Sequence, residues 1–213
     1  MKKMSVFLVV LLALCIVLPA SAQMNLGVLG GLNLANVSMD PESKGIDLSN
    51  RTVFGIGGVL DYNLNESVAF RLEPMYLLKG CKEEAEAFDV KVELKLAYLE
   101  VPVMLKYSFA VNDIKPYVMA GPAIGFNLSS KEKLTMGGVS GEEDVKDDVK
   151  SIDFGLGFGA GVNLPMGNNS IFVEARYALG LTNINDDPDV PDTDVKTKGI
   201  QIFAGITFPL STK

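Results

Sequence analysis

The strongest constraint in this chain is a two-residue alternation of side-chain character. From Ile152 to Leu164 the sequence IDFGLGFGAGVNL places apolar residues at every second position, with glycine or polar residues between them. Successive side chains of a β-strand point to opposite faces, so the pattern predicts a strand with one apolar face and one small or polar face. Glycine at alternate positions also disfavours a helix. The segment therefore belongs in a sheet.

The same alternation recurs along the chain and predicts eight strands. They cover about residues 25–37, 51–63, 67–79, 92–109, 115–129, 151–165, 171–183 and 197–210. Short turns at 64–66, 110–114 and 166–170 alternate with long loops at 38–50, 80–91, 130–150 and 184–196. Outer-membrane barrels show this alternation, with short turns at one end and long loops at the other. We therefore predict an all-β fold, an eight-stranded antiparallel up-and-down transmembrane β-barrel, over residues 23–213.

The first 22 residues have the pattern of an export signal. Lys2 and Lys3 precede an apolar run over 6–18, and the small residues Ala20-Ser21-Ala22 follow it. This order is typical of a secretory signal peptide. The run is shorter than the roughly 20 residues that a membrane-spanning helix needs. We predict that residues 1–22 are removed and that the barrel begins in the periplasm of a Gram-negative bacterium.

Alternation alone does not say which face of the barrel meets water. A soluble lipocalin-like barrel turns its apolar face inward, whereas a membrane barrel turns it outward. Here the polar face combines glycines with charges of both signs, and the interior of an eight-stranded barrel is just wide enough to be filled by side chains. Matched signs suit that interior, because an unpaired buried charge is costly. We predict that the apolar face meets lipid and that a structural network of lumen charges is formed by Arg71, Glu73, Glu100, Lys106, Glu174 and Arg176.

The carboxylates of this set suggest acid–base chemistry as an alternative role. However, the chain has no histidine, which excludes Ser-His-Asp and Cys-His arrangements and histidine-ligated metals. The formal net charge of −7 argues against a nucleic-acid partner. We predict no catalytic residue, no cofactor and no bound metal, and hence a protein that is not an enzyme.

Cys81 and an acidic loop are the remaining features that carry reactive or metal-binding groups. If residues 1–22 are removed, Cys81 has no partner for an internal disulfide, and its acidic neighbours disfavour a reactive thiolate. We interpret Cys81 as an incidental loop residue. The sequence NDDPDVPDTD at 185–194 is rich in carboxylates but lacks EF-hand spacing. We interpret it as a solvated loop and not as a Ca²⁺ site.

Three segments carry a family resemblance: KPYVMAGPAIGF at 115–126, YLEVPVMLK at 98–106 and VEARYALGLTNI at 173–184. Together with the closing stretch Phe203–Phe208, they resemble the PorT-like outer-membrane β-barrel family of Bacteroidota, over essentially all of residues 23–213. The resemblance implies an OmpX- or OmpA-like eight-stranded barrel in the outer membrane and does not imply one activity. The family takes its name from a member linked to type IX secretion. The chain departs from many outer-membrane proteins because it ends PLSTK and not in an aromatic residue.

These features predict a non-enzymatic integral outer-membrane barrel with a structural or surface-interaction role. Its partners are expected to be outer-membrane lipid and extracellular or secretion-system proteins that meet the loops 38–50, 80–91, 130–150 and 184–196. Two alternatives stay open. One is a small-molecule binding or transport barrel, either a narrow porin-like pore or a periplasmic lipocalin-like carrier. The other is an accessory of type IX protein secretion.

Overall fold

The computed structural model describes residues 23–41, 48–85, 90–109 and 114–210. The predicted signal peptide, residues 1–22, lies outside the described residues. The described part of the chain forms one short 3-10 helix, η2 (Lys146–Asp148), and the following strands: β1 (Gln23–Asp40), β2 (Leu48–Asn63), β3 (Val68–Leu72), β4 (Met75–Ala85), β5 (Val90–Ser108), β6 (Lys115–Met136), β7 (Val139–Asp144), β8 (Ile152–Met166), β9 (Asn169–Gly180) and β10 (Asp194–Leu210).

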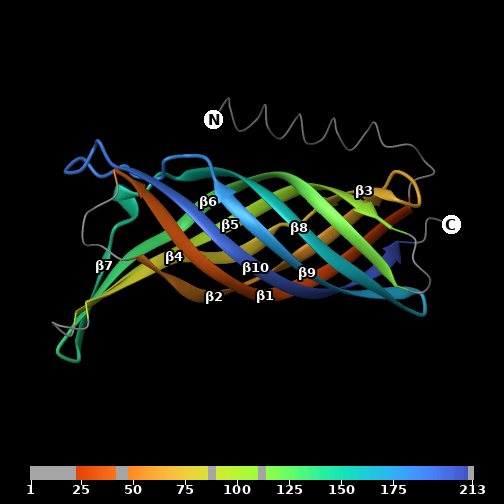
Figure 1. The fold of residues 1–213 in the computed structure, drawn as a ribbon, viewed down its shortest axis with the longest axis horizontal. Coiled ribbons are helices and arrows are strands. Elements are labelled where there is room, and N and C mark those ends of the chain that lie inside the picture. Colours follow the sequence, from red (N-terminus) through yellow and green to blue (C-terminus); the bar gives the residue numbers. More distant parts are fainter. Residues whose placement is uncertain (1–22, 42–47, 86–89, 110–113, 211–213) are drawn as a thin grey trace.

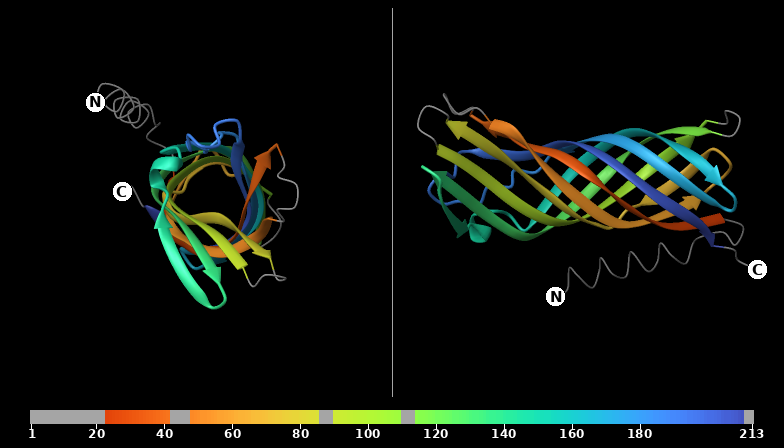
Figure 2. Two further views of the ribbon diagram at one scale, coloured as in Figure 1. Left: turned by 90° about the vertical axis from the view of Figure 1, so that its left-hand side faces the viewer. Right: turned by 90° about the horizontal axis from the view of Figure 1, so that it is seen from below.

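The strands close into a barrel (Figures 1 and 2). Strand β1 pairs with β2 on one side and with β10 on the other, and every pairing in the sheet is antiparallel. The ring runs through β1, β2, β3 with β4, β5, β6, β8, β9 and β10. The predicted all-β, antiparallel up-and-down architecture is therefore confirmed.

The described residues contain ten strands where the sequence predicted eight. The predicted strand 67–79 is divided into β3 and β4, which both pair with β2 and β5. The break falls at Glu73 and Pro74, because proline has no backbone N–H to donate to the ladder. Strand β7 is the other addition and pairs with β6.

Two predicted loops are largely strand, which corrects the boundaries at 80–91 and 130–150. Strand β4 continues to Ala85 and β5 already begins at Val90, while β6 continues to Met136 and returns as β7. Gly137 and Gly138 form this turn with φ angles of 56° and 79°, a conformation that favours glycine. Cys81, predicted to be a loop residue, is a buried residue of β4. Charged side chains replace the apolar alternation here, but the backbone ladder does not require apolar residues to continue.

The other two long connections are close to their predicted places. Strand β1 ends at Asp40 and β2 begins at Leu48, and residues 42–47 between them lie outside the described part. Residues 181–193 join β9 to β10. The strand ends that flank the four long connections lie at one end of the barrel, and the strand ends that flank the short turns lie at the other (Figure 1).

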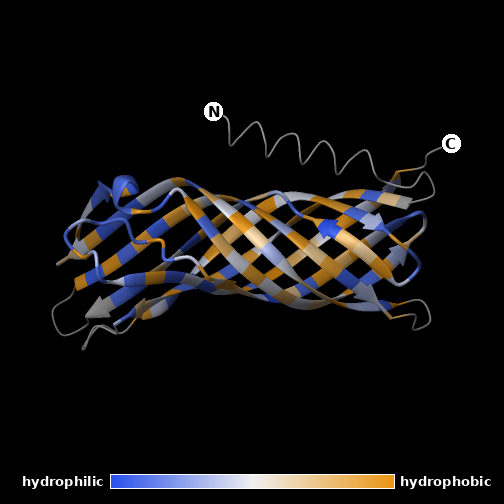
Figure 3. Cartoon of the chain, turned by 90° about the horizontal axis from the view of Figure 1, so that it is seen from above, coloured by the Kyte–Doolittle hydropathy of each residue, from blue (hydrophilic) through white to orange (hydrophobic). Residues whose placement is uncertain are grey.

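The exposed outer face of the barrel is apolar and the buried inner face is polar. On β8, Phe154 and Phe158 expose 52% and 50% of their surface, whereas Asp153 exposes 3%. Figure 3 shows the underlying alternation of hydrophobic and hydrophilic residues along the strands. A smaller apolar cluster fills part of the lumen, formed by Leu29, Val59, Met75, Leu77, Phe172 and Phe203. The predicted orientation, with the apolar face outward, is the one that the structure has.

No helix among the described residues is both long enough and apolar enough to cross a bilayer.

The closed ring predicts a heat-dependent mobility in SDS gels. A ring of paired strands offers SDS little free edge until heat opens it, so unboiled and boiled protein are expected to migrate differently. Gly161→Ala is expected to lose the folded band at a lower temperature, because its Cβ would lie 2.6 Å from the Tyr117 hydroxyl oxygen. Such overpacking costs about 1–3 kcal/mol.

Gly141→Ala is the matched control, since no atom lies within 4 Å of the Cβ that it would add. Equal melting of the folded band in both variants would contradict the packing described around Tyr117.

Candidate functional site

The six charged residues predicted from the sequence all lie in the interior of the barrel. Arg71 lies on β3, Glu73 directly after it, Glu100 and Lys106 on β5, and Glu174 and Arg176 on β9. All six are buried. Five of them form one cluster, and Glu100 lies apart in a second cluster.

The first group, here called the Arg71 cluster, comprises Asp61, Arg71, Glu73, Lys106, Tyr117, Glu174 and Arg176. Arg71 donates two hydrogen bonds to Asp61, from Nε to Oδ1 at 2.7 Å and from Nη2 to Oδ2 at 2.8 Å. Its Nη1 donates to Glu174 Oε2 at 2.8 Å, across the barrel from β3 to β9. Bidentate, charge-assisted contacts of this kind are the strongest hydrogen bonds that side chains make.

The rest of the Arg71 cluster completes the charge balance. Arg176 contacts Glu73 Oε2 at 2.6 Å and Glu174 Oε1 at 2.9 Å. Lys106 Nζ lies 3.3 Å from Asp61 Oδ2, and the Tyr117 hydroxyl donates to Glu174 Oε2 at 2.6 Å. Three cations therefore face three carboxylates. Such compensation is needed because taking a charge out of water costs several kcal/mol.

Aromatic rings support the two arginines of this cluster. The Arg71 guanidinium lies 4.5 Å from the ring centre of Phe172, and that of Arg176 lies 4.7 Å from the ring centre of Phe203. Both rings belong to the apolar cluster of the lumen. The interior is therefore packed with side chains at this level.

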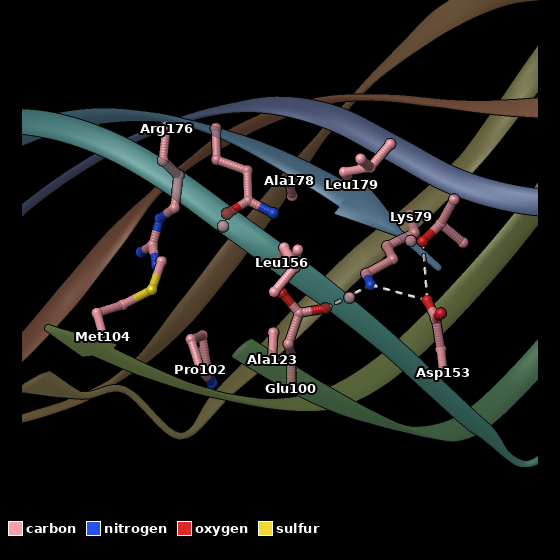
Figure 4. A pocket seen from close by; sticks show the side chains of 15 residues that line it. Lys79, Glu100, Pro102, Met104, Ala123, Asp153, Leu156, Arg176, Ala178 and Leu179 are labelled. Carbon is pink, nitrogen blue, oxygen red and sulfur yellow. Dashed lines mark hydrogen bonds and ion pairs between the residues drawn. The ribbon is translucent and has the colours of Figure 1, made fainter. Parts of the chain in front are cut away.

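The second group, here called the Lys79 cluster, comprises Lys79, Glu100, Asp153 and Thr197. Figure 4 labels the first three of these residues. Lys79 Nζ contacts Glu100 Oε2 and lies 3.2 Å from Asp153 Oδ2. The Thr197 hydroxyl donates to the same Asp153 oxygen at 2.8 Å. A cavity of about 20 Å³ lies between this cluster and Arg176, which is room for about one water molecule.

Asp61, Lys79 and Asp153 also belong to these clusters and were not among the residues predicted from the sequence. Each occupies an inward position of a strand, so the period-two pattern contained the signal. The six predicted residues were already balanced, with three cations and three carboxylates, and gave no reason to look for more. In the structure Lys106 takes Asp61 as its partner and Glu100 takes Lys79.

This arrangement argues against the alternative role of the lumen carboxylates in acid–base chemistry. Glu73 and Glu174 have fully buried side chains and are held by arginines. Beside Glu100 the cavity admits about one water and no larger substrate. Among the described residues, no group of three or more Cys, Asp or Glu side chains is placed to hold a metal ion.

The acidic loop 185–194 is organised by its own side chains. Asn185 Nδ2 donates to the carbonyl oxygens of Val190 and Thr193, at 2.8 and 2.9 Å. Its Oδ1 accepts a hydrogen bond from Asp187 N at 3.2 Å. The loop is thus closed by an amide at its first residue, and its carboxylates form no metal cage within the described residues.

The part of the barrel whose outer face is apolar is here called the apolar belt. Beyond it, strands β4 to β7 continue as a projecting sheet: Cys81–Ala85, Val90–Lys95, Lys131–Met136 and Val139–Asp144. Figure 2 shows the β6–β7 hairpin leaning away from the barrel. One face carries apolar rows, in which Val90 pairs with Met136 and Met136 with Val139. Leu134, Met136 and Val139 expose 43%, 56% and 76% of their surface. These three residues lie in the segment 130–150, which was predicted from the sequence to be a loop.

The opposite face of the projecting sheet is charged. Lys95 Nζ lies 2.7 Å from Glu142 Oε2, and Lys131 Nζ lies 2.8 Å from Glu142 Oε1. One carboxylate therefore ties together β5, β6 and β7. The hydrogen bonds from Lys131 and Lys95 lower the pKa of Glu142 from its ordinary value of 4.5 to about 2.

A closed antiparallel barrel with an apolar outer face and a charge-compensated interior is the architecture of an integral outer-membrane protein. The chain belongs to the outer membrane protein beta-barrel domain family, whose sequence profile matches residues 20–186. The barrel is accordingly an outer-membrane barrel. No curated protein matches the chain.

Several solved structures are similar to this chain at low sequence identity. Neisserial surface protein A is 16% identical over 87% of this chain and 96% of that one, with a TM-score of 0.46. Ail, the attachment invasion locus protein of Yersinia pestis, is 18% identical over 86% and 98%, with a TM-score of 0.40. OprG from Pseudomonas aeruginosa is 12% identical over 88% and 95%, with a TM-score of 0.48.

Removing the central cation of the interior is expected to destabilise the barrel strongly. Arg71→Met leaves Asp61 and Glu174 without their main partner, and breaking a buried ion pair in this way costs about 3–5 kcal/mol. Urea unfolding of the protein in lipid vesicles, followed by far-UV circular dichroism, measures the loss.

Lys131→Met removes a cation of the same sign from the exposed pair with Glu142 and serves as the control. Its unfolding midpoint is expected to stay near that of the wild type. If Arg71→Met unfolded at the same urea concentration as this control, the interior network would not stabilise the barrel.

Proposed function

We propose that this chain is a non-enzymatic outer-membrane barrel that interacts with other surface molecules through its projecting sheet. The observation that carries the proposal is an uncovered apolar face on a sheet that extends past the apolar belt. In the proposed orientation this sheet lies outside the cell. The proposal also places the N-terminus in the periplasm. It further includes membership of the PorT-like family that the sequence resembles.

The projecting sheet has two features that favour a partner. Leu134, Met136 and Val139 form a contiguous exposed apolar patch, and such patches mark interaction sites. Within the described residues, β7 pairs with β6 alone, so its second edge is free to accept another strand. A partner that adds a strand to β7 would pair its free edge, and a partner that packs on the apolar rows would remove the exposed patch from water.

The positions of the chain ends support the orientation. Met24 of β1 pairs with Leu210 of β10, so the start of the first strand and the end of the last strand both lie at the short-turn mouth. The projecting sheet lies at the other mouth (Figure 1). A chain exported through the periplasm would place its ends and short turns there.

The interior disfavours the two transport alternatives. The Arg71 and Lys79 clusters occupy the lumen with ion-paired side chains, which leaves little room for a narrow pore. A lipocalin-like carrier needs an apolar interior, whereas the large apolar side chains here lie mostly outside. An accessory role in type IX secretion stays compatible with a projecting sheet, since a secretion-system protein is one possible class of partner.

The low pKa of Glu142 predicts how the projecting sheet responds to acid. Because that pKa is lowered in the folded protein, its contribution to stability is present above about pH 4.5 and is lost as the pH falls through about 2. Carboxyl chemical shifts, followed by NMR, are expected to show Glu142 titrating near pH 2. In Lys131→Met the midpoint should move up toward 4.5, and an unchanged midpoint would contradict the Lys131 contact.

Cysteine labelling of intact cells tests the orientation and the interaction together. In a Cys81→Ser background, Val139→Cys is expected to react with a membrane-impermeant maleimide. Asn168→Cys, at the short-turn mouth, is expected to react only after the outer membrane is permeabilised. The reverse pattern would place the projecting sheet in the periplasm.

A photoreactive cross-linker at residue 139 then reports on the partner. Discrete cross-linked products are expected in intact cells, and they should disappear when Leu134 and Met136 are both changed to Ser. Products that persist in this double variant, with the SDS mobility shift intact, would show that the apolar face is not the interaction surface.

A further inference from the structure

A large cavity lies at the short-turn mouth, opposite the projecting sheet. It measures about 760 Å³, within the usual range for small-molecule sites, and is here called the polar well. Ten of its twenty lining residues carry an amide or a hydroxyl group. Most small-molecule pockets are lined mainly by apolar side chains, so the polar well suits a polar ligand and not a lipid chain.

The floor of the polar well presents a buried cation, the ammonium group of Lys106. Lys106 is buried, and its Nζ donates one hydrogen bond, of 3.3 Å, to Asp61 Oδ2. That carboxylate is already held by two hydrogen bonds from Arg71. The same Nζ lies 4.4 Å from the ring centre of Tyr117. An ammonium group has three donors, so after these two contacts Lys106 keeps one for a ligand oxygen.

The walls above this floor offer groups that both donate and accept. Asn25 on β1, Asn163 on β8 and Ser170 on β9 line the polar well from different sides. Asn25 and Asn163 are half-buried. A ligand hydroxyl also donates and accepts, so a compact ligand with many hydroxyl groups matches this ring of side chains.

The charges of the polar well favour a neutral ligand. Asp61 and Glu66 are balanced by Lys106 and Lys115. An ionic ligand therefore gains no net attraction and would upset the balance of the Arg71 cluster. An extended peptide is also disfavoured, because peptides commonly bind by adding a strand to a free edge. Strands β1 and β10 are paired with each other at this mouth and offer none.

We propose that the polar well binds a short neutral saccharide, with Lys106 and the amides of Asn25 and Asn163 hydrogen-bonded to its hydroxyl groups. This binding is separate from the projecting sheet, so it stands or falls independently of the surface interaction proposed above.

The probe is N,N′-diacetylchitobiose, added to the full chain folded in zwitterionic micelles. Detergents with sugar headgroups are avoided, because they would compete. Saturable NMR shift changes are expected, confined to residues of the polar well. Asn25→Leu and Asn163→Leu are expected to weaken the fitted affinity about fivefold or more, as loss of a hydrogen bond to a ligand does. Lys106→Met should weaken it further.

Asn50→Leu is the matched control, since Asn50 is an exposed amide at the opposite mouth. Its affinity should equal that of the wild type, and the SDS mobility shift should show that every variant is folded. The proposal is overturned if the disaccharide does not bind saturably, or if Asn25→Leu and Asn163→Leu bind like Asn50→Leu. It is also overturned if trialanine or a uronic-acid disaccharide binds as tightly, since the polar well would then favour peptides or anions.

Discussion

The structure depends on neutralising charge inside a narrow closed ring. Closure makes inward side chains from opposite walls share one lumen, and Arg71 on β3 meets Glu174 on β9 across it. Arg71 also holds Asp61 on the neighbouring strand β2. These pairs fix opposite walls relative to each other and fill the space between them. An uncompensated charge at this depth would be costly, so the cluster constrains every strand that contributes to it.

A filled interior leaves the two ends of the barrel for interaction. At one end, β4 to β7 extend past the apolar belt and expose an apolar face and the edge of β7. At the other end, the strands end just past the Arg71 cluster, and Lys106 forms the floor of the polar well.

Whether a strand could be predicted from the sequence depended on the surroundings of that segment in the barrel. Within the belt, lipid outside and a polar lumen inside impose alternation, and segments such as Ile152–Leu164 were recognised from it. Outside the belt this demand disappears. Strand β7 and the outer parts of β4 and β6 carry mixed charges, so their sequence looked like loop although their backbones pair. Cys81 was misplaced for the same reason.

The sequence by itself determined the all-β class, the outward apolar face and the inward position of the six charged residues, because a period of two assigns each residue to a face. Only the tertiary structure decided which charges meet. Lys106 pairs with Asp61, 45 residues away, and Arg71 with Glu174, 103 residues away. These partners depend on the stagger between strands around the closed ring, which brings distant residues to one level and is not written in any local pattern.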